Sequence, residues 1–79
     1  MKEQQLQAKK IKQLEALGWY VVKIIKCNKN GIPDLIAFKE KEFIFIEMKT
    51  AIGKLSELQK YRIEELRKHG FTVEVCYGN

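Results

Sequence analysis

The spacing of apolar and polar residues along the chain predicts a helix, three strands, a second helix and a fourth strand. Residues 2–17 place four apolar side chains on one stripe at 100° per residue, which predicts a helix stopped by Gly18. The stripe consists of Leu6, Ile11, Leu14 and Leu17. Residues 19–26 are rich in aromatic and β-branched side chains and predict the first strand. Residues 27–31 form a turn-rich loop.

The stretch 31–49 has the pattern of a β-hairpin, because two apolar runs flank a short charged break. A two-residue turn at Glu40 and Lys41 fixes the register of the two strands. In that register, Asp34 on one strand lies opposite Glu47 on the other. A longer turn would shift the pairing. Alternation along the strand then turns Glu47 and Lys49 to the same face as Asp34. Ile36, Phe38, Phe43 and Phe45 lie behind this polar group on that face.

The second half of the chain predicts a capped helix and a last strand. Ser56 and Gln59 match a capping box, which opens a helix that runs to about His69 and stops at Gly70. One face of this helix carries Leu58, Gln59, Arg62, Ile63 and Leu66. Gln59 therefore points inward or only caps the helix. Residues 71–77 alternate apolar and polar side chains and predict the fourth strand.

These elements predict a single α/β domain over residues 1–79, in the order αβββαβ. Three sequential strands, a helix and a last strand form a mixed four-stranded sheet flanked by helices. The step from the third strand through the second helix to the fourth strand is long enough for a right-handed parallel crossover.

The hairpin also predicts a candidate site. Directly opposed residues on one face have Cβ atoms about 4.5–5.5 Å apart, and like charges at that distance destabilise a sheet. A hard divalent cation between Asp34 and Glu47 would remove the repulsion, since such ions prefer oxygen ligands. The alternative for each residue is structural: Asp after Pro is a common turn residue, and Glu-x-Lys is common on solvated strands.

Glu3 is a second candidate in the first helix, because it projects into the apolar stripe. An acidic side chain on a core-facing line needs a partner. The alternative is a first-turn glutamate that is favoured by the helix dipole. Gln7 and Lys10 also lie near the stripe, which weakens the argument for Glu3.

The charge of the chain favours a polyanionic partner. Lys and Arg total 15 against 10 acidic residues, which gives a formal net charge of +5. Such a balance fits nucleic acid. Lys29 and Asn30 lie in the loop beside Asp34 and are candidate contacts to phosphate or base.

Cysteine content and hydropathy indicate a cytoplasmic protein. Cys27 and Cys76 lack the number and spacing of a disulfide scaffold or metal site, and we expect reduced thiols that pack in the core. No stretch approaches the roughly 20 apolar residues of a membrane span. The first residues contain no apolar segment of the kind found in signal peptides.

Together these motifs resemble the VRR-Nuc family of the PD-(D/E)xK nuclease superfamily. The resemblance covers nearly the whole chain and rests on three segments in order: 31–38, 45–50 and 53–59. Pro33-Asp34 and Glu47-Met48-Lys49 supply the superfamily signature. The resemblance implies a restriction-endonuclease-like core and a stand-alone phage or bacterial nuclease, located in the bacterial cytoplasm or in a phage-infected host.

The resemblance also implies roles for particular residues. Family members cut DNA phosphodiesters with Mg²⁺ or Mn²⁺, and Asp34, Glu47 and the backbone carbonyl of Met48 would hold the metal. Lys49 would orient or activate the attacking water and stabilise charge on the phosphate. Gln59 would support the Lys49 end of the site. Glu3 would bind metal through water or complete the cluster.

The resulting hypothesis is a Mg²⁺- or Mn²⁺-dependent endodeoxyribonuclease in replication, recombination or repair. Resemblance to junction-cleaving relatives implies a structure-selective enzyme that resolves four-way (Holliday) junctions. The alternatives are a flap or restriction-like nuclease and a non-catalytic DNA-binding module. Phosphate contacts by Lys29, Lys54 and Lys60 would make DNA binding salt-dependent.

We also expect a homodimer, because a domain of this size grips little DNA alone and its core is small. Aromatic residues exceed what one thin core needs, and aromatic side chains are favoured at interfaces. The residues in question are Trp19, Tyr20, Tyr61, Phe71 and Tyr77.

Overall fold

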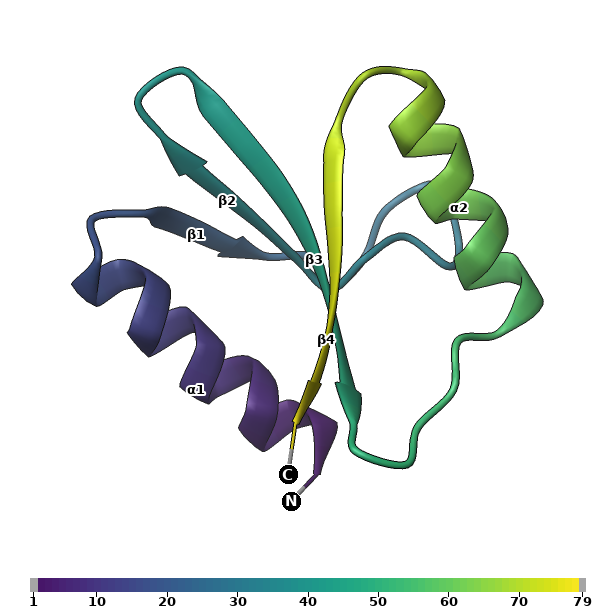
Figure 1. Cartoon of the computed structure of the whole chain (residues 1–79), viewed down its shortest axis with the longest axis horizontal. Coiled ribbons are helices and arrows are strands. Elements are labelled where there is room, and N and C mark those ends of the chain that lie inside the picture. Colours follow the sequence, from purple (N-terminus) through teal and green to yellow (C-terminus); the bar gives the residue numbers. More distant parts are fainter. Residues whose placement is uncertain (1, 79) are drawn as a thin grey trace.

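The computed structural model describes residues 2–78 and contains two helices and four strands (Figure 1). In chain order, the elements are α1 (Glu3–Ala16), β1 (Tyr20–Lys23), β2 (Leu35–Lys39), β3 (Glu42–Thr50), α2 (Glu57–Lys68) and β4 (Thr72–Gly78). The predicted αβββαβ order is confirmed. No helix among the described residues is both long and apolar enough to span a membrane.

The strands form one mixed sheet in the order β1-β2-β3-β4, and α1 and α2 lie on opposite sides of it (Figure 1). The pairs β1–β2 and β2–β3 are antiparallel, whereas β3 and β4 are parallel and are connected through α2. This arrangement is the restriction-endonuclease-like core that the sequence predicted.

The hairpin has the predicted register. Lys39 pairs with Glu42, and the last pair of the β2–β3 ladder is Leu35 with Ile46. Glu40 adopts a positive φ of 56° in the two-residue turn. Such a turn matches the twist of the strands, which explains why the short charged break was enough to predict the pairing.

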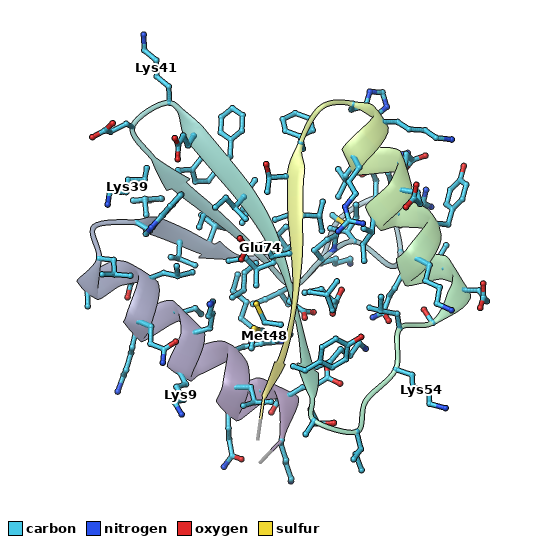
Figure 2. The ribbon with its side chains drawn as sticks, viewed as in Figure 1. Lys9, Lys39, Lys41, Met48, Lys54 and Glu74 are labelled. Atoms are coloured by element: carbon cyan, nitrogen blue, oxygen red, sulfur yellow. The ribbon has the colours of Figure 1, made fainter. Side chains whose placement is uncertain are left out.

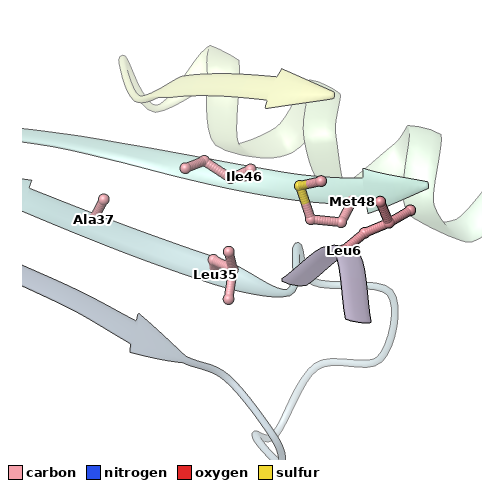
Figure 3. Packing of buried hydrophobic residues seen from close by; sticks show 5 residues of the cluster. All are labelled: Leu6, Leu35, Ala37, Ile46 and Met48. Atoms are coloured by element: carbon pink, nitrogen blue, oxygen red, sulfur yellow. The ribbon is translucent and has the colours of Figure 1, made fainter. Parts of the chain in front are cut away.

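The main core lies between α1 and the sheet. Five buried side chains meet there and form one cluster (Figure 3). They are Leu6, Leu35, Ala37, Ile46 and Met48. Ile11 and Leu14 pack against the cluster as the predicted stripe requires. Leu17 does not: it follows the last residue of α1 and is 65 % exposed, so its predicted core position is wrong.

Two other expectations change in the structure. Cys27 is exposed, so only Cys76 packs against the core as expected. The first strand is shorter than the predicted 19–26 and ends at Lys23, because its partner β2 begins at Leu35. One further backbone bond, from Ile24 N–H to the carbonyl of Asp34 (2.8 Å), continues the contact beyond the ladder.

Helix α2 begins with the predicted capping box. The Ser56 hydroxyl accepts from the N–H of Gln59 at 3.1 Å, and the Gln59 side chain accepts from the N–H of Ser56 at 2.9 Å. Of the five residues predicted on one face of this helix, Ile63 is the buried one. Leu58, at 43 % exposed, lies at the border, where it contacts Gly31 of the β1–β2 loop.

An aromatic row crosses the sheet on the face opposite the α1 core. Ring centroids lie 6.4 Å apart for Tyr20 and Phe38, 5.8 Å for Phe38 and Phe43, and 5.7 Å for Phe43 and Phe71. Phe45 joins Phe71 at 5.8 Å. Tyr20, Phe43 and Phe71 are 72 %, 44 % and 37 % exposed. The aromatic row, defined by these five residues, is therefore only partly covered.

We predict that Gly31→Ala destabilises the protein more than Gly70→Ala. Both glycines have positive φ, 81° and 88°, and a left-handed alanine costs about 1–2 kcal/mol. A Cβ at Gly31 would lie 2.7 Å from Leu58 Cγ, whereas one at Gly70 meets no atom within 4 Å. Overpacking adds about 1–3 kcal/mol at Gly31. Equal losses in urea unfolding would contradict the close contact between the loop and α2.

Candidate metal centre

Asp34 and Glu47 lie where β2 and β3 separate. They occupy the position directly beyond the last ladder pair, Leu35 with Ile46. The Asp34 carboxylate accepts a hydrogen bond from the backbone N–H of Met48 at 3.1 Å. The carboxylate of Asp34 thus takes the place of a backbone carbonyl of the neighbouring strand as the acceptor for the N–H of Met48. The hairpin register and this bond together fix Asp34 beside Glu47.

Glu47 is a buried acid without a hydrogen-bond donor. It is 1 % exposed, and neither carboxylate oxygen receives a hydrogen bond from residues 2–78. Burial raises the pKa of Glu47 from its ordinary 4.5 to about 8, and the neighbouring Asp34 carboxyl adds to the shift. Lys49 opposes the shift, and the charge of Glu3 adds to it. The metal-free protein therefore binds a proton at Glu47 near neutral pH.

Glu3 of α1 completes an acidic cluster with these two residues. One carboxylate oxygen from each of Glu3, Asp34 and Glu47 lies within 4.8 Å of the others. The structure brings together these three predicted acids, which come from α1, the residue preceding β2, and β3. Three carboxylates at this spacing suit a hard divalent cation. Such a cation would be the partner that the buried carboxylate of Glu47 does not find among residues 2–78.

Lys49 lies at the border of the acidic cluster. Its ammonium nitrogen is 3.9 Å from Oε2 of Glu3, and its side chain is 10 % exposed. One lysine cannot balance three carboxylates, so the cluster keeps a net negative charge when all three are ionised. Lys49 thus leaves the site attractive to a cation while it holds a positive charge at the edge.

The other predicted site residues are distributed around this centre. Gln59 is engaged in the capping box of α2, which was the structural alternative for it; its role beside Lys49 stays a prediction. The carbonyl of Met48 belongs to a residue of β3 that pairs with Cys76 of β4. Its role as a ligand also stays a prediction.

The predicted DNA contacts fall in three settings. Lys29 and Asn30 line a pocket of about 280 Å³ together with Asp34, which places the loop beside the acidic cluster. Lys54 projects outward from the loop between β3 and α2 (Figure 2). Lys60 forms an ion pair with Glu57 at 3.2 Å, so part of its charge is already balanced.

The sequence reasoning missed the role of Arg62. The sequence pattern places this residue on one face of α2 with Leu58 and Ile63 and predicts no contact for it. Its Nε donates to the carbonyl of Asn30 at 2.8 Å, and its guanidinium also pairs with Glu65 at 3.1 Å. Arg62 therefore ties the loop that carries Lys29 and Asn30 to α2. An arginine beside Leu58, Ile63 and Leu66 on one helix face was the available signal, because a partly buried guanidinium needs acceptors.

A mixed four-stranded sheet flanked by two helices, with carboxylates and a lysine where two strands separate, defines a restriction-endonuclease-like nuclease domain. The family model of the VRR-NUC domain matches residues 1–79. The chain therefore belongs to the VRR-NUC family and is a nuclease-type domain, as the resemblance implied. A comparison with curated proteins found no match.

The raised pKa of Glu47 predicts an unusual pH dependence of stability. The folded protein holds a proton that the unfolded chain releases, so the free energy of unfolding falls as pH rises from about 4.5 to about 8. Glu47→Gln should remove most of this slope without metal. Glu74→Gln, at an exposed glutamate of β4, should keep it. Urea unfolding across this pH range measures the slope, and an unchanged slope in Glu47→Gln would contradict the assignment.

Proposed function

We propose that this chain is a Mg²⁺- or Mn²⁺-dependent endodeoxyribonuclease that hydrolyses phosphodiester bonds in branched DNA. The observation that carries the proposal is the cluster of Glu3, Asp34 and Glu47, with oxygens within 4.8 Å and Lys49 beside it. Membership of a nuclease family supports the reaction class. A structure-selective role in replication, recombination or repair, such as cutting four-way junctions, is the finer part of the proposal.

Each residue of the cluster has a chemical task in this scheme. Asp34 and Glu47 hold the cation, together with the Met48 carbonyl, and Glu3 adds the third carboxylate. The bound cation lowers the pKa of water and neutralises charge on the phosphate. Lys49 orients the attacking water and stabilises negative charge at the phosphate, because its ammonium is a compact point charge. Gln59 supports the end of the site at Lys49.

The loop beside Asp34 supplies the contacts to DNA in this scheme. Lys29 and Asn30 line the pocket next to the acidic cluster, and the bond from Arg62 to Asn30 holds their loop in place. Lys54, in the loop between β3 and α2, binds backbone phosphate in this scheme. Lys60 contributes to DNA binding once its ion pair with Glu57 is replaced by an ion pair with a DNA phosphate. Binding of this kind weakens steeply as salt increases.

Cleavage assays test the reaction class. Labelled junction, flap, single-stranded and duplex DNA should be cut only with Mg²⁺ or Mn²⁺, and the junction fastest. Asp34→Asn should lower the rate by at least about 10²-fold, the scale for losing a group that stabilises transition-state charge. Glu74→Gln, at the exposed glutamate of β4, should keep the wild-type rate.

The outcomes separate the candidate functions. Full activity in Asp34→Asn would refute the site. DNA binding without any cleavage in either metal would identify a binding module. Preference for flap or linear duplex DNA would favour a flap or restriction-like nuclease over junction cleavage.

We further propose that the working unit is a two-fold homodimer joined through the aromatic row. Its exposed rings offer on the order of 300 Å² of apolar surface, given about 150–250 Å² per aromatic side chain. This suits the apolar centre of an interface that buries about 800 Å² per partner. The adjoining turn, residues 39–42, alternates lysine and glutamate. A strip with both signs is complementary to itself across a two-fold axis.

This interface would leave both active sites free. Asp34 precedes Phe38 by four residues along the strand. At the usual rise of about 3.3 Å per strand residue, the two residues are about 13 Å apart. Each subunit would therefore present its own acidic cluster beside the interface rather than inside it. Two sites related by a two-fold axis suit paired cuts on opposed strands of a four-way junction.

Replacement of an exposed ring tests the dimer. Phe43→Glu should convert a particle of two chains into one of a single chain, because it buries charge in the interface centre. Tyr61→Glu, at a 59 % exposed ring of α2 outside the aromatic row, should leave the mass unchanged. Sedimentation at micromolar protein measures both. A wild-type particle of one chain's mass, with and without junction DNA, would refute the dimer.

A further inference from the structure

Gln7 is the most deeply buried polar side chain of α1, and it has no assigned role. It is 7 % exposed, and together with Leu6 it makes up the buried part of this helix. Its amide oxygen has no hydrogen-bond donor among residues 2–78. Within the described residues, the other buried side-chain oxygens in this condition are the two of Glu47. A buried acceptor without a hydrogen-bond donor lowers the stability of the fold. A ligand that binds at this position, or a function that requires it, would account for the buried amide.

The helix places Gln7 next to the acidic cluster. Gln7 follows Glu3 by four residues, so the two side chains share one face of α1 with Cβ atoms about 5–6 Å apart. Long side chains on a helix lean toward its N-terminus. This tendency favours a Gln7 amide directed toward the turn that carries Glu3. The carboxylate of Glu3 lies within 4.8 Å of Asp34 and Glu47 oxygens.

We propose that Gln7 is a positioning residue of the metal centre, whose amide oxygen faces the hydrated divalent cation. This inference rests on the proposed metal-dependent function. Amide oxygens are ordinary partners of hard divalent cations and of their water ligands. A neutral amide adds an acceptor without adding charge to a cluster that already holds three carboxylates. A water molecule held by the cation would then supply the hydrogen-bond donor that the Gln7 oxygen lacks.

The proposal explains why the core of this small domain contains an amide where an apolar residue would pack. Leu6, the neighbouring buried residue, joins Met48 in the core cluster, so α1 is well anchored without Gln7. Gln7 directly follows that anchor in the helix and lies about one turn beyond Glu3. It therefore couples the docked part of α1 to the turn that supplies the third carboxylate.

Titration of Mn²⁺ into the DNA-free protein tests this role without relying on activity. Gln7→Met keeps the length of the side chain but removes the amide, and should weaken Mn²⁺ binding by about 10–100-fold, the range for residues that support metal ligands. The rise in melting temperature on adding Mn²⁺ should shrink accordingly. Gln13→Met, at an exposed glutamine of the same helix, should match the wild type in both measurements.

Gln7→Glu provides the second arm and decides the matter if Gln7→Met fails to fold. A carboxylate facing the cation should bind Mn²⁺ at least as tightly as the wild type. Unchanged Mn²⁺ affinity in a folded Gln7→Met, or weaker binding in Gln7→Glu, would overturn the inference. In that case, metal-dependent DNA cleavage by the wild type would still support the proposed nuclease function. Conversely, a wild type that binds Mn²⁺ but cuts no DNA would refute the proposed function and leave the role of Gln7 intact.

Discussion

The structure depends most on holding two carboxylates together where β2 and β3 separate. Glu47 is almost fully buried, and Asp34 beside it repels the ionised form of Glu47. Repulsion and burial both oppose this arrangement, so the surrounding fold must impose it. The paired strands do so through their register, and Asp34 contributes by accepting a bond from the N–H of Met48. The carboxylate that creates the repulsion also completes the backbone bonding of the sheet.

The parts of the fold that follow from local chemistry were predictable from the sequence. The two-residue turn fixes the hairpin register, since a slip by one residue would move every side chain to the other face. The capping box fixed the start of α2, because its two bonds join residues three apart. The register of the hairpin was therefore enough to predict that Asp34 lies close to Glu47. The structure places both carboxylates in one cluster.

Features that depend on how distant elements dock were harder to predict. Periodicity placed Leu17 on the apolar stripe, yet α1 ends at Ala16 and the chain turns away through Gly18, whose φ is 92°. The same periodicity could not show that Gln7 is buried more deeply than Ile11. The bond from Arg62 to Asn30 joins residues 32 positions apart, and no local pattern predicts it. The proximity of Glu3 to Glu47 likewise depends on the angle at which α1 packs on the sheet, which local sequence patterns do not determine.

The position of Glu3 as the first residue of α1 gives the acidic cluster a movable member. Terminal helical turns open and close far more often than the whole protein unfolds, with single residues joining a helix in about nanoseconds. Asp34 and Glu47 are held by the sheet and lack this freedom. Fraying of this one turn would therefore remove the third carboxylate from the cluster while the sheet stays folded. A cation bound by all three carboxylates would favour the folded turn, so order in the N-terminal turn would report the occupancy of a site held mainly by Asp34 and Glu47.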